Sequence, residues 1–425
     1  MIASASLVAL GAAGVQVAAN AQGFASTDTS KPWSLSATLR GFYDDNYVNA
    51  ASSSKLDSFG FEVSPSASAS FSQGQTSGSV RYTYSLRYYQ DRADRGFSSA
   101  DHAHEAVVTF DHAFTERYSV NLSDSFVIGQ EPELLAAGLP LSTLYRMDGN
   151  NMRNWGTISF NAQLTPLLGA KLTYVNRFYD YEQEGGDPFA PSRSGLLDRI
   201  EHLGALDLRW QALPQTVAIV GYQYGQVDYT SDEIIVSMPI DPFDFDSSIR
   251  NNRSHYGYLG VEHNFNPDLF GAIRGGVQHV NYYNEPGDIT SLAPYVDASL
   301  KYRYTADSHV EAGFRHSFHQ TDLLGASDTG VTTDAEASSV YASLNHKITP
   351  YLTGSLLAQY QHDKFNGGAY DGQSENFYIA GVNLEYQFDQ HLAAHVGYNY
   401  DRLVSDVAGR DFTRNRVYLG VTASY

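Results

Sequence analysis

The last ten residues of the chain, Arg416 to Tyr425, read R-V-Y-L-G-V-T-A-S-Y. Apolar residues alternate here with polar or small ones, and the chain ends on an aromatic side chain. The apolar positions are Val417, Leu419, Val421, Ala423 and Tyr425. Strict alternation with a period of two is typical of a β-strand with one apolar and one polar face. This stretch predicts a strand, which either a soluble sandwich or a barrel could contain.

The composition suits a β-rich protein. The chain has 425 residues, including 36 Gly, 31 Tyr, 22 Phe and no Cys, and its mean hydropathy is -0.33. Beyond the first 22 residues no run is long and apolar enough for a membrane helix. A transmembrane barrel can still have this composition, because only alternate residues of its strands face lipid. The lack of Cys excludes disulfides, thiol nucleophiles and cysteine-ligated metals.

The charge and the motifs point away from several function classes. A net charge of -20 argues against nucleic-acid binding, which needs a basic surface. The acidic run Asp241–Asp246 lacks the glycine and distal glutamate of an EF-hand, so we interpret it as a solvated loop. His309, His316 and His319 are too far apart along a strand, and on different faces, to form a metal site. No spacing indicates a nucleophile elbow. We expect no enzyme activity, no metal and no cofactor.

The N-terminus reads as a sorting segment. Residues Ser6 to Ala19 are small and apolar, and Ala19-Asn20-Ala21 fits a cleavage site before Gln22. No Lys or Arg precedes Lys31, so we expect the true start to lie upstream. The predicted organisation is a secretory signal at residues 1–21 and a single barrel domain at residues 22–425.

A short turn recurs along the chain. An apolar residue is followed by Thr, Asn or Asp, which start turns by bonding their own backbone. Clear copies follow Phe114, Phe265, Ile348 and Phe388. Counted from a first strand at Trp33–Tyr43, eight such turns give about 18 strands of 10 to 14 residues, with a range of 16 to 20. The longer connections, among them Gln130–Asn151 and Thr230–Asn252, fall at the opposite end; these two either fold inward or form a rim flap.

Charges on alternate positions of otherwise apolar strands decide between a sandwich and a barrel. Val80, Tyr82 and Leu86 would face lipid, whereas Arg81 and Arg87 would face inward. In a large barrel such a polar face meets a water-filled lumen. The fold class is therefore all-β: a transmembrane antiparallel up-and-down barrel with short periplasmic turns and longer extracellular loops.

The same alternation predicts which charged residues point inward and line the pore. The candidates are Arg81, Arg87, Lys171, Arg177, Arg209, Arg274, Asp297, Lys301, Arg303, Glu311, Arg315 and Glu385, with Glu62 as a further acidic candidate. Rings of such charges set ion preference in channels. Equally, many of these residues could be cross-strand ion pairs that neutralise each other. The inward aromatics Tyr89, Tyr295, Tyr341 and Tyr418 could stack on sugars or simply pack.

With these features in hand, the chain resembles bacterial outer-membrane barrels, and more narrowly the putative β-barrel porin-2 type. The resemblance rests on the entry strand, the repeated turns and the exit strand Val417–Tyr425, which resembles the assembly signal of such barrels. It implies an outer-membrane location in a Gram-negative-type bacterium, contact with lipid and insertion by the barrel-assembly machinery. A homo-oligomer is possible, since many porins form trimers.

Three functions remain open. The first is a passive channel for small hydrophilic solutes. The second is a pore for exopolysaccharide export, which the resemblance implies only as a possibility. The third is a closed structural or adhesive barrel. The direction of any ion preference does not follow from the sequence.

Overall fold

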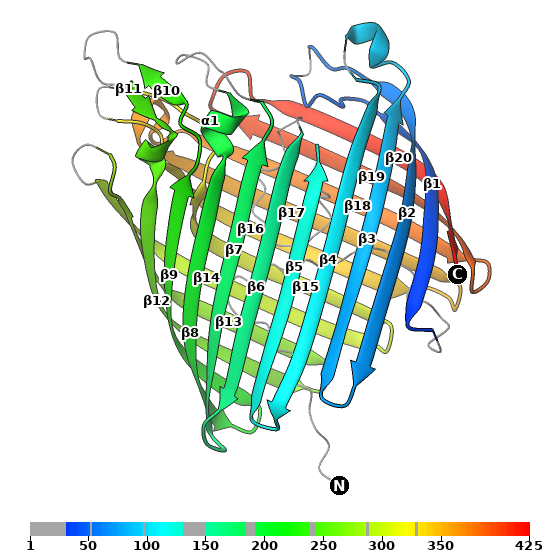
Figure 1. The fold of residues 1–425 in the computed structure, drawn as a ribbon, viewed down its shortest axis with the longest axis vertical. Helices are drawn as coiled ribbons and strands as arrows, with labels where there is room; N and C mark the ends of the chain where they lie inside the picture. Colours follow the sequence, from blue (N-terminus) through cyan, green and yellow to red (C-terminus); the bar gives the residue numbers. More distant parts are fainter. Residues whose placement is uncertain are drawn as a thin grey trace.

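The computed structural model describes residues 31–51, 53–96, 98–130, 150–183, 192–237, 244–285, 289–327 and 330–425. The predicted signal segment lies outside these residues, and so does most of the loop Gln130–Asn151. In the described part, 18 strands form one closed antiparallel barrel (Figure 1). The predicted fold class and strand number are confirmed.

The barrel strands follow one another around the wall in chain order. The first nine are β1 (Trp33–Asp44), β2 (Ser58–Gln73), β3 (Thr76–Tyr89), β4 (Ala100–Thr115), β5 (Tyr118–Gly129), β6 (Asn151–Gln163), β7 (Leu168–Tyr181), β8 (Arg199–Leu213) and β9 (Thr216–Tyr229). The second nine are β12 (Asn252–Asn266), β13 (Leu269–Tyr282), β14 (Ile289–Thr305), β15 (Ser308–Gln320), β16 (Asp334–Lys347), β17 (Leu352–Asn366), β18 (Ser374–Gln387), β19 (Leu392–Ser405) and β20 (Phe412–Ser424). β9 pairs with β12, and β1 pairs with β20.

The C-terminal strand closes the barrel. β20 lies between β19 and β1, and Leu35 and Tyr425 exchange backbone hydrogen bonds of 3.0 and 2.8 Å. Val417, Leu419 and Val421 are exposed on the outer surface. Closure pairs every strand on both sides, so the sheet has no free edge.

Twelve of the 18 barrel strands have 12 to 14 residues, within the 10 to 14 that we expected, and the other six have 15 to 17. The hydrogen-bonded ladders continue past the apolar band into polar sequence. β2, for example, begins at Ser58 and ends at Gln73. The period-two pattern predicted the apolar band, whereas the ladder itself ends only where the chain turns.

All eight short turns form between the strands that we predicted. Their polar residues accept hydrogen bonds from the backbone just ahead. Asn266 Oδ1 accepts from the amides of Asp268 and Leu269, both at 2.9 Å. Asp389 Oδ1 accepts from His391 N at 2.7 Å and Leu392 N at 3.0 Å. These bonds fix the hairpin geometry locally and leave the loops at the other end free to elaborate.

The long-loop end of the barrel holds the remaining elements. They are η1 (Ala93–Arg95), α1 (Arg193–Leu197), the two-stranded hairpin β10 (Ile234–Ser237) with β11 (Asp244–Asp246), η2 (Ser247–Arg250) and η3 (Gly368–Tyr370). Figure 1 shows α1 and the hairpin above the rim at β7–β9. Among the helices of the described residues, none has the length and apolarity that a membrane crossing requires.

Candidate functional site

The inner face of the barrel gathers charged side chains that alternate with outward apolar ones. On β3, Val80 and Tyr82 are exposed outside, while Arg81 and Arg87 pair with carboxylates on neighbouring strands. On β14, Leu300 and Tyr302 are exposed outside. The predicted faces of these strands match the structure, and the inner charges can be read strand by strand.

One part of the inner wall carries an excess of cations. We call the inner faces of β6–β9, β12 and β13 the basic arc. Its six cationic residues are Arg153, Lys171, Arg177, Arg199, Arg209 and Arg274, and its three carboxylates are Glu201, Asp207 and Glu262. Three positive charges are therefore left without a matching carboxylate on these strands.

At the short-turn end of the basic arc, Glu262 accepts hydrogen bonds from two arginines. Arg209 Nη1 and Nη2 donate to its two carboxylate oxygens at 3.0 and 2.5 Å, and Arg274 donates to Oε1 at 3.1 Å. Asp207 accepts from the Tyr258 hydroxyl at 2.5 Å and lies 3.8 Å from Arg274. Each carboxylate is thus engaged by other groups, although Asp207 sits directly across the ladder from Lys171.

Lys171 is left without an ion pair or hydrogen bond among the described residues. Its side chain is only 7% exposed, and its charge lies in electrostatic range of Asp207, Arg209 and Arg274. Toward the long-loop end of the same arc, Arg153 is also buried, and in the described chain it has no ion pair or hydrogen bond. Arg177, in contrast, forms an ion pair with Glu201 at 3.0 Å. A buried cation with no partner is costly. These two positions therefore attract anions.

The opposite wall has the opposite balance. We call the inner faces of β16–β19 the acidic arc. It carries the carboxylates Asp363, Glu375, Glu385 and Asp401 and the single cation Lys347. Figure 1 shows these strands behind the basic arc, across the lumen. Arg410 and Arg416, which lie outside these four strands, pair with Glu375 at 3.3 Å and with Asp401 at 3.6 Å, so Asp363 and Glu385 carry the excess of negative charge on this wall.

The remaining predicted candidates form ion pairs with a neighbouring strand or, for Arg303, with the turn between β12 and β13. The pairs are Arg81–Glu105 at 3.4 Å, Arg87–Glu62 at 3.1 Å, Lys301–Glu311 at 3.8 Å, Arg303–Asp268 at 3.5 Å and Arg315–Asp297 at 3.3 Å. For these residues the structure fits the second interpretation given above, in which opposite charges on neighbouring segments neutralise each other. Their contribution to ion preference is correspondingly small.

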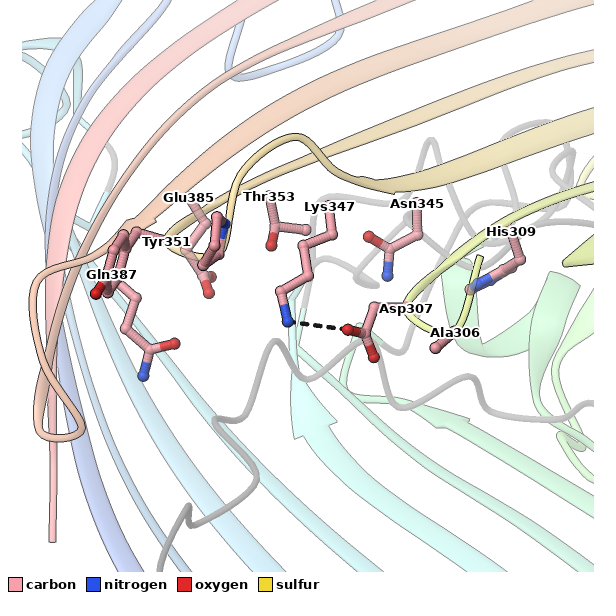
Figure 2. A pocket seen from close by; sticks show the side chains of 10 residues that line it. Ala306, Asp307, His309, Asn345, Lys347, Tyr351, Thr353, Glu385 and Gln387 are labelled. Atoms are coloured by element: carbon pink, nitrogen blue, oxygen red, sulfur yellow. Dashed lines mark hydrogen bonds and ion pairs between the residues drawn. The ribbon is translucent and has the colours of Figure 1, made fainter. Parts of the chain in front are cut away.

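Glu385 lies at the short-turn mouth of the lumen. It lines a hollow of about 450 Å³ together with His309, Asn345 and Lys347. Figure 2 shows Lys347 pointing toward Asp307, which it meets at 2.9 Å, while Glu385 stands apart from this pair. Among the described residues Glu385 makes no ion pair. It is the counterpart, on the acidic arc, of Lys171 on the basic arc.

The inner tyrosines pack onto the barrel wall. A Cβ added at Gly313 would lie 2.3 Å from the Tyr341 ring, and one at Gly397 would lie 2.2 Å from the Tyr418 ring. The two rings thus cover glycines on the neighbouring strands. Tyr89 and Tyr295 are also buried, against other aromatic rings. All four tyrosines therefore pack against the barrel wall, which is the second of the two roles considered above.

The loop Thr230–Asn252 connects the two sides of the long-loop mouth. Buried Arg250 donates to the carbonyl of Leu196 at 3.1 Å and also to that of Thr321. Leu196 follows β7, whereas Thr321 follows β15 on another part of the wall. Ile235 and Ile249 pack with Val331 in one apolar cluster. The described residues of this loop, 230–237 and 244–252, therefore contact the connection between β15 and β16 at the same mouth.

Two partners in the site were missed at the sequence level. Asp207 stands between Leu206 and Leu208, and Glu262 follows Val261, so alternation marked both as inward. The alternation does not give the register between strands. It is this register that brings Arg209 of β8 close to Glu262 of β12, across β9.

Comparison with known proteins gives one family match and several similar folds. Residues 243–425 match the family described as putative beta-barrel porin 2. The matched residues run from β11 to β20 and make up less than half of the chain. The predicted resemblance to this family is thereby confirmed, together with the outer-membrane location that it implied. No curated protein matches the chain.

The similar solved structures are distant. Acinetobacter baumannii OccAB4 aligns with a TM-score of 0.45 and 12% identity over 93% of this chain and 99% of its own. Pseudomonas aeruginosa OpdK with vanillate gives 0.45 and 12% over 92% and 99%. A BenF-like porin from Pseudomonas fluorescens Pf-5 gives 0.47 and 12% over the same shares.

Proposed function

We propose that this barrel is an outer-membrane channel through which small hydrophilic solutes diffuse passively. The carrying observation is the separation of charge across the lumen, with the basic arc facing the acidic arc. A field of this kind orients and selects small charged or dipolar solutes on their way through. No catalytic activity is proposed.

Within this proposal, Lys171 and Glu385 are the residues that set ion preference. Their charges have no ion-pair partner among the described residues, and they lie on opposite walls. The predicted ion pairs, such as Arg87–Glu62, support the wall instead. Insertion with β20 as the assembly signal, removal of residues 1–21 as a signal peptide and formation of a homo-oligomer remain predictions.

The other two functions have less support. An exporter of polysaccharide calls for exposed aromatic tracks, and the four inner tyrosines are packed against the wall. A closed structural barrel calls for a filled lumen without charge separation. The matched family is described as a porin, which favours the diffusion channel.

The test is single-channel conductance of the refolded full chain in a planar bilayer under a KCl gradient. We expect steady openings with a reversal potential that differs from zero. A folded barrel without conductance at any voltage would contradict the channel, and a reversal potential of zero would contradict the selective field.

A further inference from the structure

Two hydrogen-bond donors without a partner lie near each other on the inner face of β6. Arg153 and Trp155 are two residues apart on this strand, so both side chains point into the lumen. Arg153 makes no hydrogen bond or ion pair in the described chain, and its Nε is fully buried. The buried Nε1 of Trp155 likewise has no hydrogen-bond partner among these residues. Buried polar groups nearly always have a partner, so two neighbouring donors without one point to a ligand.

The hydroxyls of two tyrosines extend this set of donors. Tyr179 lies directly across the ladder from Arg153, and its ring contacts that of Trp155 at a centroid distance of 6.4 Å. Tyr181 is buried in the same cluster, against Leu197 of α1. Neither hydroxyl bonds to another side chain of the described residues. A guanidinium and an indole can only donate, and a tyrosine hydroxyl can donate as well.

The charged neighbours on the barrel strands leave this place positive. Glu105, the carboxylate in electrostatic range of the guanidinium on β6, already pairs with Arg81 at 3.4 Å. On the other side, Arg177 and Arg199 share the carboxylate of Glu201, at 3.0 and 2.8 Å. With the guanidinium on β6, four arginines thus meet two carboxylates on these described strands.

Two further carboxylates lie at the rim, in electrostatic range of Tyr181, and both are engaged. Asp198 accepts from the Tyr181 amide at 2.7 Å and from the hydroxyl of Ser194. Asp322 accepts from Arg410 at 2.8 Å. The guanidinium on β6 therefore keeps a charge that no carboxylate of the described chain pairs with.

We propose that these donors hold a small monovalent anion, of the size of chloride, as a resident counter-ion of the barrel wall. The guanidinium, the indole N–H and the two phenol O–H groups would donate to it. The anion is monovalent because the site has one guanidinium without a carboxylate. It is small because Arg153, Tyr179 and Tyr181 are only 6%, 4% and 3% exposed. Such an ion neutralises a charge that is costly to bury alone. This inference does not depend on solute passage.

Trp155 itself can report on the site. The chain has three tryptophans, and the other two, Trp33 and Trp210, are exposed on the outer surface. In the refolded full-length barrel with Trp33→Phe and Trp210→Phe, fluorescence comes from Trp155 as the remaining indole. Iodide, a halide that quenches indole fluorescence, replaces gluconate at constant ionic strength. We expect quenching that saturates as the site fills and that chloride reverses. Quenching that rises linearly without saturation would overturn the site.

A pair of variants locates the bound ion. Arg153→Gln in the same background should weaken iodide binding by at least about tenfold, because the charged donor is lost. Arg315→Gln is the matched control, since Arg315 also lies on the inner face but pairs with Asp297 at 3.3 Å. The control should bind iodide as the parent does, and an equal loss in both variants would overturn the assignment to Arg153. Sulfate that competes as well as chloride would overturn the monovalent assignment.

Stability gives a second readout. The urea midpoint of the wild-type barrel should rise as chloride replaces gluconate at constant ionic strength, because an ion bound by the folded state alone stabilises that state. Arg153→Gln should lose this dependence. In gluconate the variant should be no less stable than the wild type, because it removes a buried charge without a partner. A midpoint that rises equally with chloride in both proteins would overturn the resident ion.

Discussion

Arg414 on the last strand and Asp44 on the first form a buried ion pair that joins the two ends of the barrel wall. Arg414 Nε lies 3.0 and 2.9 Å from the two carboxylate oxygens, and Nη2 lies 2.5 Å from Oδ2. Both side chains are 1% exposed. The two residues are 370 positions apart in the chain, and β1–β20 pairing places them together.

Removal of one partner of this pair should destabilise the closed barrel strongly. Asp44→Asn leaves a buried guanidinium without its counter-charge, which costs about 3–5 kcal/mol. The urea midpoint of unfolding in detergent should fall accordingly. Lys347→Met is the control, because its partner Asp307 is exposed and such pairs contribute at most about 1 kcal/mol. Equal midpoints for the two variants would show that the pair does not lock the seam.

The two faces of a strand should respond differently to the same charge. Leu300 is exposed outside, so Leu300→Arg puts a charge against lipid at a cost of about 2–4 kcal/mol. Ser299→Arg puts the same charge on the inner face and should fold. Folding yield in vesicles, read from the gel shift between folded and heated samples, separates them. If both assemble equally well, the face assignment of β14 is wrong.

The unpaired lumen charges should control ion selectivity. Lys171→Gln removes a cation from the basic arc and should move the reversal potential toward cation selectivity. Glu385→Gln should move it in the opposite direction, because it removes a carboxylate from the acidic arc. Lys301→Gln is the control, since Lys301 is half-exposed and pairs with Glu311. A shift of equal size in the control would remove the special role of Lys171.

Tyr258 depends on a bare backbone at its neighbour. A Cβ at Gly221 would lie 2.1 Å from the Tyr258 ring and 2.7 Å from an oxygen of Asp207. Gly221→Ala should therefore displace the ring and lower stability by about 1–3 kcal/mol. Gly41→Ala meets open space and serves as the reference for thermal unfolding. A melting temperature unchanged in Gly221→Ala would show that the ring has room to move.

The carboxyl of Glu285 should make the loop contact at the long-loop mouth depend on pH. Burial and the nearby Asp334 raise the pKa of Glu285 above its ordinary value, although its Oε1 accepts from Val331 N at 3.2 Å. A raised pKa means that this contribution to stability is present at low pH and is lost as pH rises through the folded-state pKa. Glu285→Gln should flatten the pH profile of unfolding in that range. The same slope in wild type and variant would assign the dependence to other groups.

Much of this molecule followed from the sequence alone. Alternation along strands such as Val417–Tyr425 gave the class, the strand number and the two faces, because side chains of a strand point to opposite sides in strict succession. The polar turn residues, Asn266 and Asp389 among them, bond their own backbone, so their hairpins are local as well.

Only the tertiary structure decided which charges meet. Arg209 reaches Glu262 two strands away, and Arg414 reaches Asp44 from the other end of the chain, because both contacts depend on register and closure. The register between β7 and β8 also leaves Lys171 without an ion pair among the described residues. Periodicity determines the face on which a residue lies, but its neighbours there are set by how far each strand is shifted against the next.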